Sequence, residues 1–382
     1  MSLKVAYLSA RGPDDLLYWS GTAHYIGKSL SDQGLQVSHL GPFTAPLPRL
    51  YLLKHRFYSE VRGKNYMAEY DRLRARLLGR LTGATIERVG ADVALGFTPD
   101  LLAYARTKVP LAVWTDCTFP AMKDFYPYYT NLCRETLRDG FALEKEMFDR
   151  CRICFFACEW AARSAREHYH LAPEKSHLVP FGANIECRRT LEDIKVLIEQ
   201  RQTKPCRLLF IGRIWQRKGG DIALAVAEKL NASGLPTELT LVGSGPPDGR
   251  PLPPYVKSLG FVSKTTPEGR RQLDELLARS HFLIVPSRAE AYGIVFCEAS
   301  SFGVPSLATN VGGIPTVIRN GLNGWTFPLE ASADEYCAFV LKTMEKPETY
   351  RQLALSSFGE YESRLNWRVA GARVKQLLEQ AL

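Results

Sequence analysis

Two cations and a double glycine follow an apolar run in the segment FIGRIWQRKGGDIAL. Arg213 and Lys218 flank a turn, and Gly219 and Gly220 open a segment that is typical of a helix. The N-terminus of a helix attracts anions through its free N–H groups and its dipole. The segment lacks the second glycine and the Ser/Thr of a Walker A loop. It therefore predicts either a diphosphate-binding loop or a surface loop with solvated cations.

Two glutamates, Glu290 and Glu298, lie eight residues apart in VPSRAEAYGIVFCEAS. Glu290 follows an apolar run, and Glu298 lies inside a helix that we expect to begin near Gly293. Carboxylates accept hydrogen bonds from hydroxyl groups, which are the groups that sugars offer. Glycine at the helix start leaves room for a close backbone approach to free N–H donors. The alternative is that Glu290 caps the helix and Glu298 is solvated, because acids in a first turn stabilise a helix.

Short apolar runs alternate with helical stretches along the chain, which predicts parallel sheets covered on both faces. The expected strands are residues 3–9, 35–41, 91–97, 109–116 and 153–159, and after a restart residues 206–213, 237–245, 255–262, 281–287 and 304–310. The expected helices are residues 22–33, 221–231, 267–279 and 367–382. We expect a last break in helical structure near residues 356–358. The loops at the strand ends are where such sheets bind ligands.

The chain has 382 residues, of which 46% are hydrophobic and 23% are charged. This composition excludes a disordered chain and a collagen-like repeat, and the length fits two domains. The polar segment 179–205 separates two similar halves. We find no uncharged apolar run of the roughly 18–20 residues that a membrane-spanning helix needs. Together with nine cysteines, an odd number, this predicts a cytoplasmic protein.

The motifs are more informative as an ordered set than one by one. GR-x4-KG, VGSGP, PS-x2-E-x7-E, GGIP and NG follow one another between about Arg207 and Phe327. This order resembles the GT-B-fold retaining glycosyltransferases of family 4, the glycogen-synthase-like group. The resemblance implies an α/β fold with two Rossmann-like domains that face each other across a cleft. It implies an acceptor-binding domain over 1–188 with a C-terminal helix (363–382) that crosses back to it, and a nucleotide-sugar-binding domain over 189–362.

The resemblance also implies roles for individual residues. Arg213 and Lys218 would neutralise the donor diphosphate, Glu298 would hold the ribose, and Glu290 would contact the donor sugar near the reacting carbon. Further donor contacts would come from Gly21, Val262, Tyr292, Gly293 and Ile294. Asp116 lies where many relatives have a His or Asp near the acceptor. Two positions depart from the family pattern, with Thr316 in place of Glu after GGIP and Ser244 in place of Asp in VGDGP.

The implied reaction is transfer of a sugar, with retention of configuration, from a UDP-, GDP- or ADP-sugar to an acceptor hydroxyl. The acceptor would be a sugar or a lipid-linked molecule, and we expect neither a metal nor a cofactor. The run that contains Cys151, Cys154 and Cys158 predicts a buried strand entering a helix rather than a zinc site. The alternatives are a sugar-nucleotide 2-epimerase of the same fold and a basic nucleic-acid-binding protein, although no nucleic-acid-binding module accompanies the charge.

A basic stretch extends from Arg49 to Arg88, with ten Lys or Arg against four acids. Tyr, Phe and Leu side chains are interleaved with these cations. The stretch predicts either a solvated helix face or a surface for an anionic membrane or acceptor. For the second interpretation we expect a weak peripheral contact at the inner face of the membrane. It would be made by Arg72, Arg74, Arg76 and Arg80.

Overall fold

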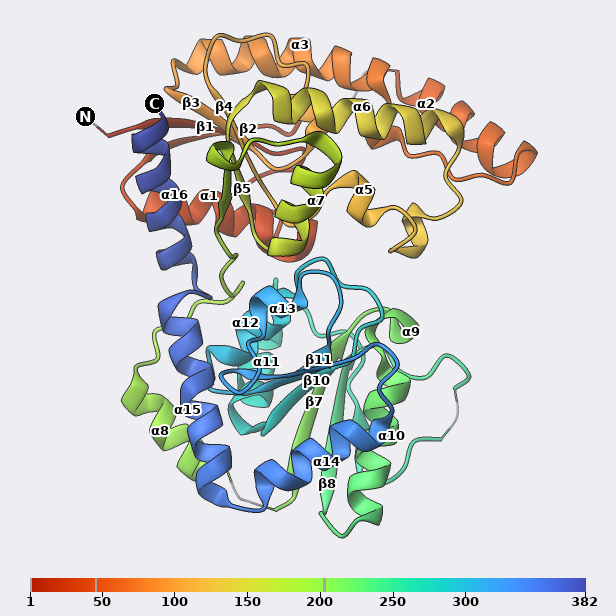
Figure 1. The fold of residues 1–382 in the computed structure, drawn as a ribbon, viewed down its shortest axis with the longest axis vertical. Helices are drawn as coiled ribbons and strands as arrows, with labels where there is room; N and C mark the ends of the chain where they lie inside the picture. Colours follow the sequence, from red (N-terminus) through yellow and green to blue (C-terminus); the bar gives the residue numbers. More distant parts are fainter. Residues whose placement is uncertain (1, 45–46, 202–203, 250) are drawn as a thin grey trace. The chain divides into compact units, whose positions relative to one another are not determined.

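The computed structural model describes residues 2–44, 47–201, 204–249 and 251–382 (Figure 1). These residues form two compact units. Unit 1 comprises Met1–Pro180 and Trp367–Leu382, and unit 2 comprises Phe181–Asn366. Among the described residues, no helix combines the length and the apolar character needed to cross a bilayer.

Unit 1 is built on a six-stranded parallel sheet with the order β2-β1-β3-β4-β5-β6. Its strands are β1 (Lys4–Leu8), β2 (Gln36–Leu40), β3 (Val93–Gly96), β4 (Leu111–Thr115), β5 (Cys151–Phe156) and β6 (Ser176–Leu178). Every residue of β3 and β4 is buried. Near-continuous apolar strands of this kind are expected where helices cover both faces of a parallel sheet.

The helices of unit 1 cover both faces of this sheet (Figure 1). They are α1 (Thr22–Asp32), α2 (Pro48–Arg56), α3 (Arg72–Val89), α4 (Pro99–Leu102), α5 (Phe119–Met122), α6 (Arg134–Arg150), α7 (Glu159–Tyr169) and α16 (Trp367–Ala381). Helices α1 and α16 pack together on one face, while α3 and α6 lie on the other. Lys375 of α16 donates a hydrogen bond to the Gln33 carbonyl at 2.9 Å. The C-terminal helix therefore returns to the first domain, as the resemblance implied.

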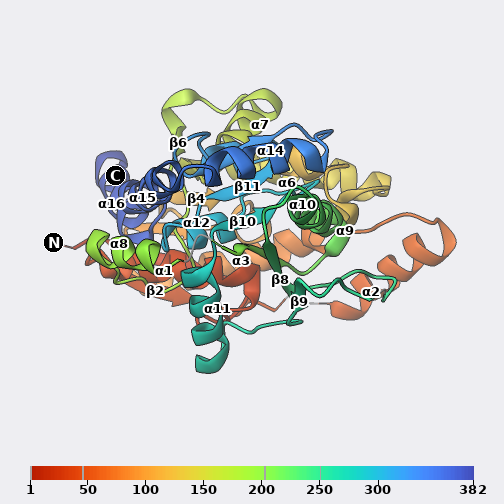
Figure 2. The same ribbon diagram turned by 90° about the horizontal axis from the view of Figure 1, so that it is seen from below.

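Unit 2 repeats this plan with a six-stranded parallel sheet of order β12-β11-β10-β7-β8-β9. The strands are β7 (Cys206–Gly212), β8 (Thr237–Gly243), β9 (Val256–Ser258), β10 (Phe282–Val285), β11 (Ser306–Thr309) and β12 (Gly324–Phe327). The helices are α8 (Leu191–Gln200), α9 (Trp215–Lys218), α10 (Gly220–Ala232), α11 (Pro267–Arg279), α12 (Ile294–Ser300), α13 (Ile314–Val317), α14 (Ala333–Met344) and α15 (Pro347–Ser363). Helices α10 and α14 pack on one face of the sheet, and α11 and α12 pack on the other (Figures 1 and 2).

The two helix-covered sheets confirm the predicted pair of Rossmann-like domains. The predicted strand and helix before and after Cys158 are confirmed as β5 and α7. The break expected near residues 356–358 is wrong, because α15 continues through Ser357 and Phe358, which are buried, to Ser363. Strands β6 and β12, which are short, were not anticipated. The limits and roles predicted for the domains (1–188 with 363–382, and 189–362) stay predictions.

The packing of α16 on α1 can be tested at Gly371, a glycine within α16. A Cβ at Gly371 would lie 2.6 Å from the Ser29 carbonyl oxygen, so the two helices touch through their backbones. We expect Gly371→Ala to destabilise unit 1 by about 1–3 kcal/mol, because overpacking forces the backbone apart. The matched control is Gly359→Ala in α15, where nothing lies within 4 Å of the added methyl group. It should leave stability unchanged or raise it slightly. Equal urea midpoints for the two variants would contradict the packing described here.

Candidate active site

The strand order of unit 2 reverses between β7 and β10. The chain runs from β7 outward to β8 and β9, and then returns to place β10 on the other side of β7. In open parallel sheets, ligands bind beyond the carboxyl ends of the strands at such a reversal point. The loops that follow β7 and β10 carry Arg213, Lys218 and Glu290. Three predicted site residues therefore lie at the position that the topology favours for a ligand.

The loops after β7 and β10 are packed directly against each other. Gly219 ends the single turn of α9 with a φ of 73°, and a Cβ there would lie 2.0 Å from the Pro286 carbonyl oxygen. Only glycine allows this conformation and this approach together. The Arg288 N–H donates to the Arg217 carbonyl at 2.7 Å, and the Arg288 guanidinium pairs with Asp221. The backbone thus fixes the spacing between the two loops.

An ion-pair cluster joins the side chains of these loops. The Lys218 ammonium donates to the Glu290 carboxylate, and an Arg217 nitrogen lies 3.6 Å from the same oxygen. Arg217 also donates to the Ala289 carbonyl at 2.8 Å. The three side chains are between 10% and 15% exposed, so water screens their charges only weakly. Two cations around one carboxylate give these three groups a net positive charge.

A second buried ion pair holds Glu298. Its carboxylate accepts a hydrogen bond from the Lys264 ammonium, and its side chain is 2% exposed. Burial raises the pKa of Glu298 above its ordinary value, although Lys264 and the Asn184 backbone act in the opposite direction. Glu298 lies in α12, one turn beyond Gly293. The side chain is therefore buried and fixed in position. The alternative interpretation, a solvated Glu298, is wrong.

The loop between β9 and α11 contributes the third wall of the site. The Arg213 guanidinium lies 5.0 Å from the centre of the Phe261 ring, and Phe261 is 56% exposed. Val262 and Lys264 follow in the same loop. Arg213 and Lys218, the two cations predicted for the diphosphate, thus contact different partners. Arg213 lies towards the loop that carries Val262, and Lys218 lies towards Glu290.

Tyr292, Gly293 and Ile294 form the start of α12. The Tyr292 side chain is buried, and its hydroxyl donates to the Phe181 carbonyl at 2.7 Å. This contact anchors the backbone of the loop. Gly293 has a φ of 91° and caps the helix that begins at Ile294. The Gly313 N–H of the double-glycine loop donates to the Glu290 carbonyl at 3.2 Å, so this loop also supports the site.

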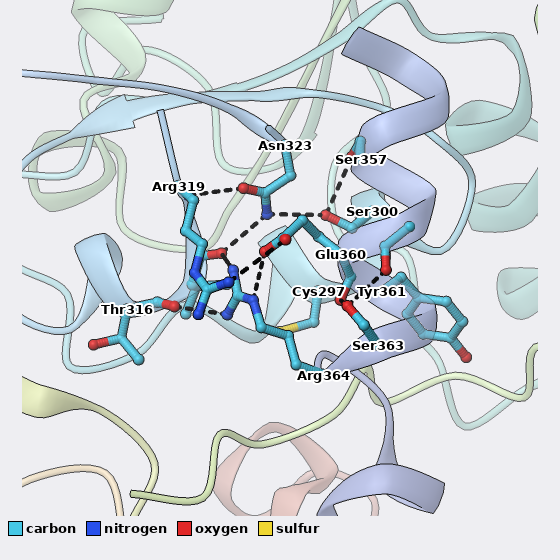
Figure 3. Close-up of polar contacts among 12 residues, drawn as sticks. Cys297, Ser300, Thr316, Arg319, Asn323, Ser357, Glu360, Tyr361, Ser363 and Arg364 are labelled. Atoms are coloured by element: carbon cyan, nitrogen blue, oxygen red, sulfur yellow. Dashed lines mark hydrogen bonds and ion pairs between the residues drawn. The ribbon is translucent and has the colours of Figure 1, made fainter. Parts of the chain in front are cut away.

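Helix α13, which follows the double-glycine loop, is held at its C-terminal end by Arg364, the residue that follows α15 (Figure 3). The Arg364 guanidinium donates to the carbonyls of Thr316 and Val317, each at 2.8 Å. It also pairs with Glu360. Cations at helix C-termini stabilise the free carbonyl groups. Thr316, which departs from the family pattern, takes part in this contact through its backbone, so its side chain is not needed there.

Gly21 and Asp116 lie in unit 1. Gly21 has a φ of 89° and caps α1, after Trp19 and Ser20 with φ values of 49° and 56°. The Trp19 ring stacks on Phe97, which follows β3, at 4.8 Å. This stack lies at the reversal point of the first sheet, between β1 and β3. Asp116 is buried directly after β4, the next strand.

Three charged residues escaped the sequence analysis. Arg217 and Lys264 pair with the two predicted glutamates. Glu144 is buried in α6, and both of its oxygens accept the Phe119 N–H at 2.8 Å. Burial raises the pKa of Glu144 to about 8. Glu144 lies four residues after Gly140 and three before Met147, both buried, so it is on the apolar face of the helix. This spacing is a sequence signal from which the burial of Glu144 could have been predicted.

Comparison with known proteins adds to this geometry. The sequence pattern of the glycosyl transferases group 1 family matches residues 205–346. Unit 2 belongs to this family. The chain is 28% identical over 237 residues to the D-inositol 3-phosphate glycosyltransferase of Thermobispora bispora, a match that covers 58% of this chain and 54% of the relative. The chain thus spans about half the length of this relative.

Two solved structures share the fold over nearly the whole chain. Sucrose-phosphate synthase from Thermosynechococcus elongatus has a TM-score of 0.66 and 15% identity, covering 99% of this chain and 98% of that one. Anabaena HepE, solved in complex with UDP-glucose, has a TM-score of 0.63 and 16% identity, covering 99% and 100%. The resemblance to glycosyltransferases is confirmed by the family match within unit 2, and the predicted GT-B fold is confirmed. The roles of individual residues stay predictions.

The raised pKa of Glu144 predicts a pH dependence of stability. A carboxyl group that titrates near pH 8 when folded, and near its ordinary 4.5 when unfolded, holds more protons in the folded state. Folding stability then falls as pH rises from about 4.5 to 8. We expect the Glu144→Gln variant to lack this fall. As the pH is raised from 5 to 9, its free energy of unfolding should therefore gain on the order of 1–3 kcal/mol relative to that of the wild type. Urea unfolding at both pH values measures it. Glu146→Gln, at a half-buried position of the same helix, is the control, and an equal gain there would refute the assignment.

Proposed function

We propose that the protein is a retaining glycosyltransferase that moves a sugar from a nucleotide diphosphate sugar to an acceptor hydroxyl, in the synthesis of a glycan, polysaccharide or glycolipid. The observation that carries this proposal is the Lys218–Glu290 pair at the reversal point of the second sheet. One loop offers a cation for phosphate, and the other offers a carboxylate for sugar hydroxyls. The solved complex of HepE, which shares the fold, contains UDP-glucose, a donor of this class.

Charge governs the proposed binding of the diphosphate. Lys218 is paired with Glu290, and Arg217 lies beside the same carboxylate. A diphosphate can therefore take over the Lys218 ammonium while Arg217 continues to compensate Glu290. Arg213, whose guanidinium lies beside the exposed Phe261 ring, would meet the diphosphate from the other side. Both cations would be in position before the bond breaks, which is the condition for effective electrostatic stabilisation.

The chemical step would follow from the same arrangement. Departure of the diphosphate develops negative charge on its leaving oxygen and positive charge on the anomeric carbon. Lys218 and Arg213 would stabilise the first, and Glu290 would orient the donor sugar beside the second. The leaving phosphate oxygen is itself the group that would accept the proton of the attacking hydroxyl on the same face. Asp116, buried after β4, would orient the sugar or the acceptor.

The nucleotide would be held mainly by α12 and the β9–α11 loop. Glu298 would accept hydrogen bonds from the ribose hydroxyls, and Val262 would lie against the base. The first turn of α12, from Gly293 and Ile294, would offer backbone N–H groups. Lys264 keeps the buried Glu298 carboxylate paired. This pairing would favour the ionised form of Glu298 against the effect of burial on its pKa, and an ionised carboxylate is the stronger acceptor.

We expect Lys218→Ala and Arg213→Ala each to lower turnover by about one to three orders of magnitude, because each removes a charge that stabilises the leaving group. Steady-state sugar transfer measures this. Arg288→Ala is the matched control, since it removes a cation from the same pair of loops that is paired with Asp221 and 42% exposed. The Arg288→Ala substitution should lower turnover much less. Wild-type turnover in both test variants would refute the diphosphate assignment.

The two glutamates should differ in what they affect. Glu298→Ala should weaken binding of the bare nucleotide, because Glu298 would contact the ribose. Glu290→Ala should mainly slow sugar transfer, because Glu290 would contact the donor sugar. Titration calorimetry with the nucleoside diphosphate separates the two roles, with turnover measured on the same preparations. Equal losses of nucleotide affinity in the two variants would contradict this division of roles.

The proposed reaction itself is tested by its product. We expect incubation with the donor and an acceptor to give a new glycosidic bond with the anomeric configuration of the donor, which proton NMR couplings identify. An inverted product would refute retention. If the only product is an isomerised nucleotide sugar and no sugar is transferred, the protein is an epimerase and the proposal is wrong.

A further inference from the structure

An exposed apolar stripe runs along the helical stretch that α2 begins. Helix α2 (Pro48–Arg56) continues directly into η2 (Phe57–Val61). Leu50, Leu53, Phe57 and Val61 are 36%, 64%, 46% and 67% exposed. Their spacing of three, four and four residues puts them on one side of a helix. Large apolar side chains exposed together in this way mark a surface that contacts a partner or a membrane.

The opposite side of the same stretch is anchored in unit 1. The Tyr51 side chain is buried. The Lys54 ammonium donates to the carboxylates of Asp71 and Glu135, each at 2.6 Å, and Tyr58 donates to Glu135 at 3.0 Å. These contacts hold the helix in place. The stripe therefore belongs to an ordered surface of unit 1, and α2 lies at the edge of that unit in both views (Figures 1 and 2).

Cations accompany the stripe. Arg49, Arg56 and Arg62 are exposed on the same stretch, with Glu60 as the acid among them. In the part of the chain that the structure describes, none of these three arginines forms an ion pair. The Arg62 guanidinium lies 5.6 Å from the Phe57 ring, at the stripe itself. An apolar stripe flanked by cations is complementary to a bilayer surface that combines acyl chains with anionic headgroups.

Of the four arginines of α3 that the sequence favoured for this role, Arg80 is exposed, while the other three have partners within unit 1. Arg74 pairs with the buried Asp100 at 2.6 Å. Arg72 donates to the Tyr104 hydroxyl at 3.2 Å, and the Arg76 guanidinium lies 5.4 Å from the Tyr104 ring. Their contacts pack α3 against the unit. They are thus less available to lipid than the arginines of α2 and η2.

We propose that Leu50, Leu53, Phe57 and Val61, with Arg49, Arg56 and Arg62, form a docking surface for anionic lipid bilayers. We call these seven residues the α2 surface. The apolar side chains would enter the boundary between headgroups and acyl chains, and the arginines would contact lipid phosphates. The inference concerns unit 1 and does not depend on the chemistry proposed for unit 2.

Co-sedimentation of the full chain with vesicles tests the α2 surface. The vesicles are phosphatidylcholine alone or phosphatidylcholine mixed with phosphatidylglycerol, each at low and high salt. We expect at least about tenfold stronger binding to the anionic vesicles at low salt, and a large loss of this preference at high salt. Leu53→Ser with Phe57→Ser should lower binding at both salt concentrations. Arg49→Gln with Arg56→Gln should abolish most of the preference for anionic lipid.

The matched control is Leu73→Ser with Leu81→Ser in α3, where the leucines are 46% and 50% exposed. This variant removes similar apolar area outside the α2 surface, and we expect it to bind like the wild type. Circular dichroism confirms that each variant is folded, and all the substituted residues are exposed. Equal binding to neutral and anionic vesicles would overturn the proposal. So would a loss in the α3 control as large as that in the α2 variants.

Discussion

The ion pair between Lys218 and Glu290 connects the two loops at which the sheet of unit 2 reverses its strand order. Its geometry depends on the close contact between Gly219 and Pro286, because a side chain at position 219 would force the loops apart. Tyr292 and Gly313 hold the Glu290 loop from two further directions. Several backbone contacts therefore fix the position of this ion pair. A preorganised site of this kind loses little free energy to reorganisation when an anion binds.

The sequence predicts much of this fold because its signals are local. Alternating apolar runs and helical stretches gave most of the strands, and helix α11 was predicted at its observed limits, Pro267–Arg279. The positions of Arg213, Lys218 and Glu290 at strand ends also follow from local order along the chain. Because parallel strands bring their carboxyl ends to one edge, such residues come together without any knowledge of long-range contacts.

Other features depend on contacts between residues far apart in the chain. Lys264 pairs with Glu298 across 34 positions, and the N–H that Glu144 accepts lies 25 residues away, at Phe119. No local rule selects these partners. The end of α15 was misplaced for a similar reason, because Ser357 is held in the helix by burial and by its contact with Ser300 (Figure 3). Likewise, Arg74 pairs with Asp100 and Arg72 donates to Tyr104 across 26 and 32 positions, and the charge pattern could not show these contacts.

In the proposed site, Lys218 would leave Glu290 to bind the second phosphate of the donor. Titration calorimetry with nucleoside mono- and diphosphates of uridine, guanosine and adenosine measures this exchange of partners, in the wild type and in Lys218→Met. We expect one of the diphosphates to bind the wild type at least about tenfold more tightly than its monophosphate, as a charge-assisted contact requires. Lys218→Met should remove most of this difference. Equal affinities of the wild type for the mono- and diphosphate, or a difference that survives in Lys218→Met, would show that Lys218 does not bind the second phosphate.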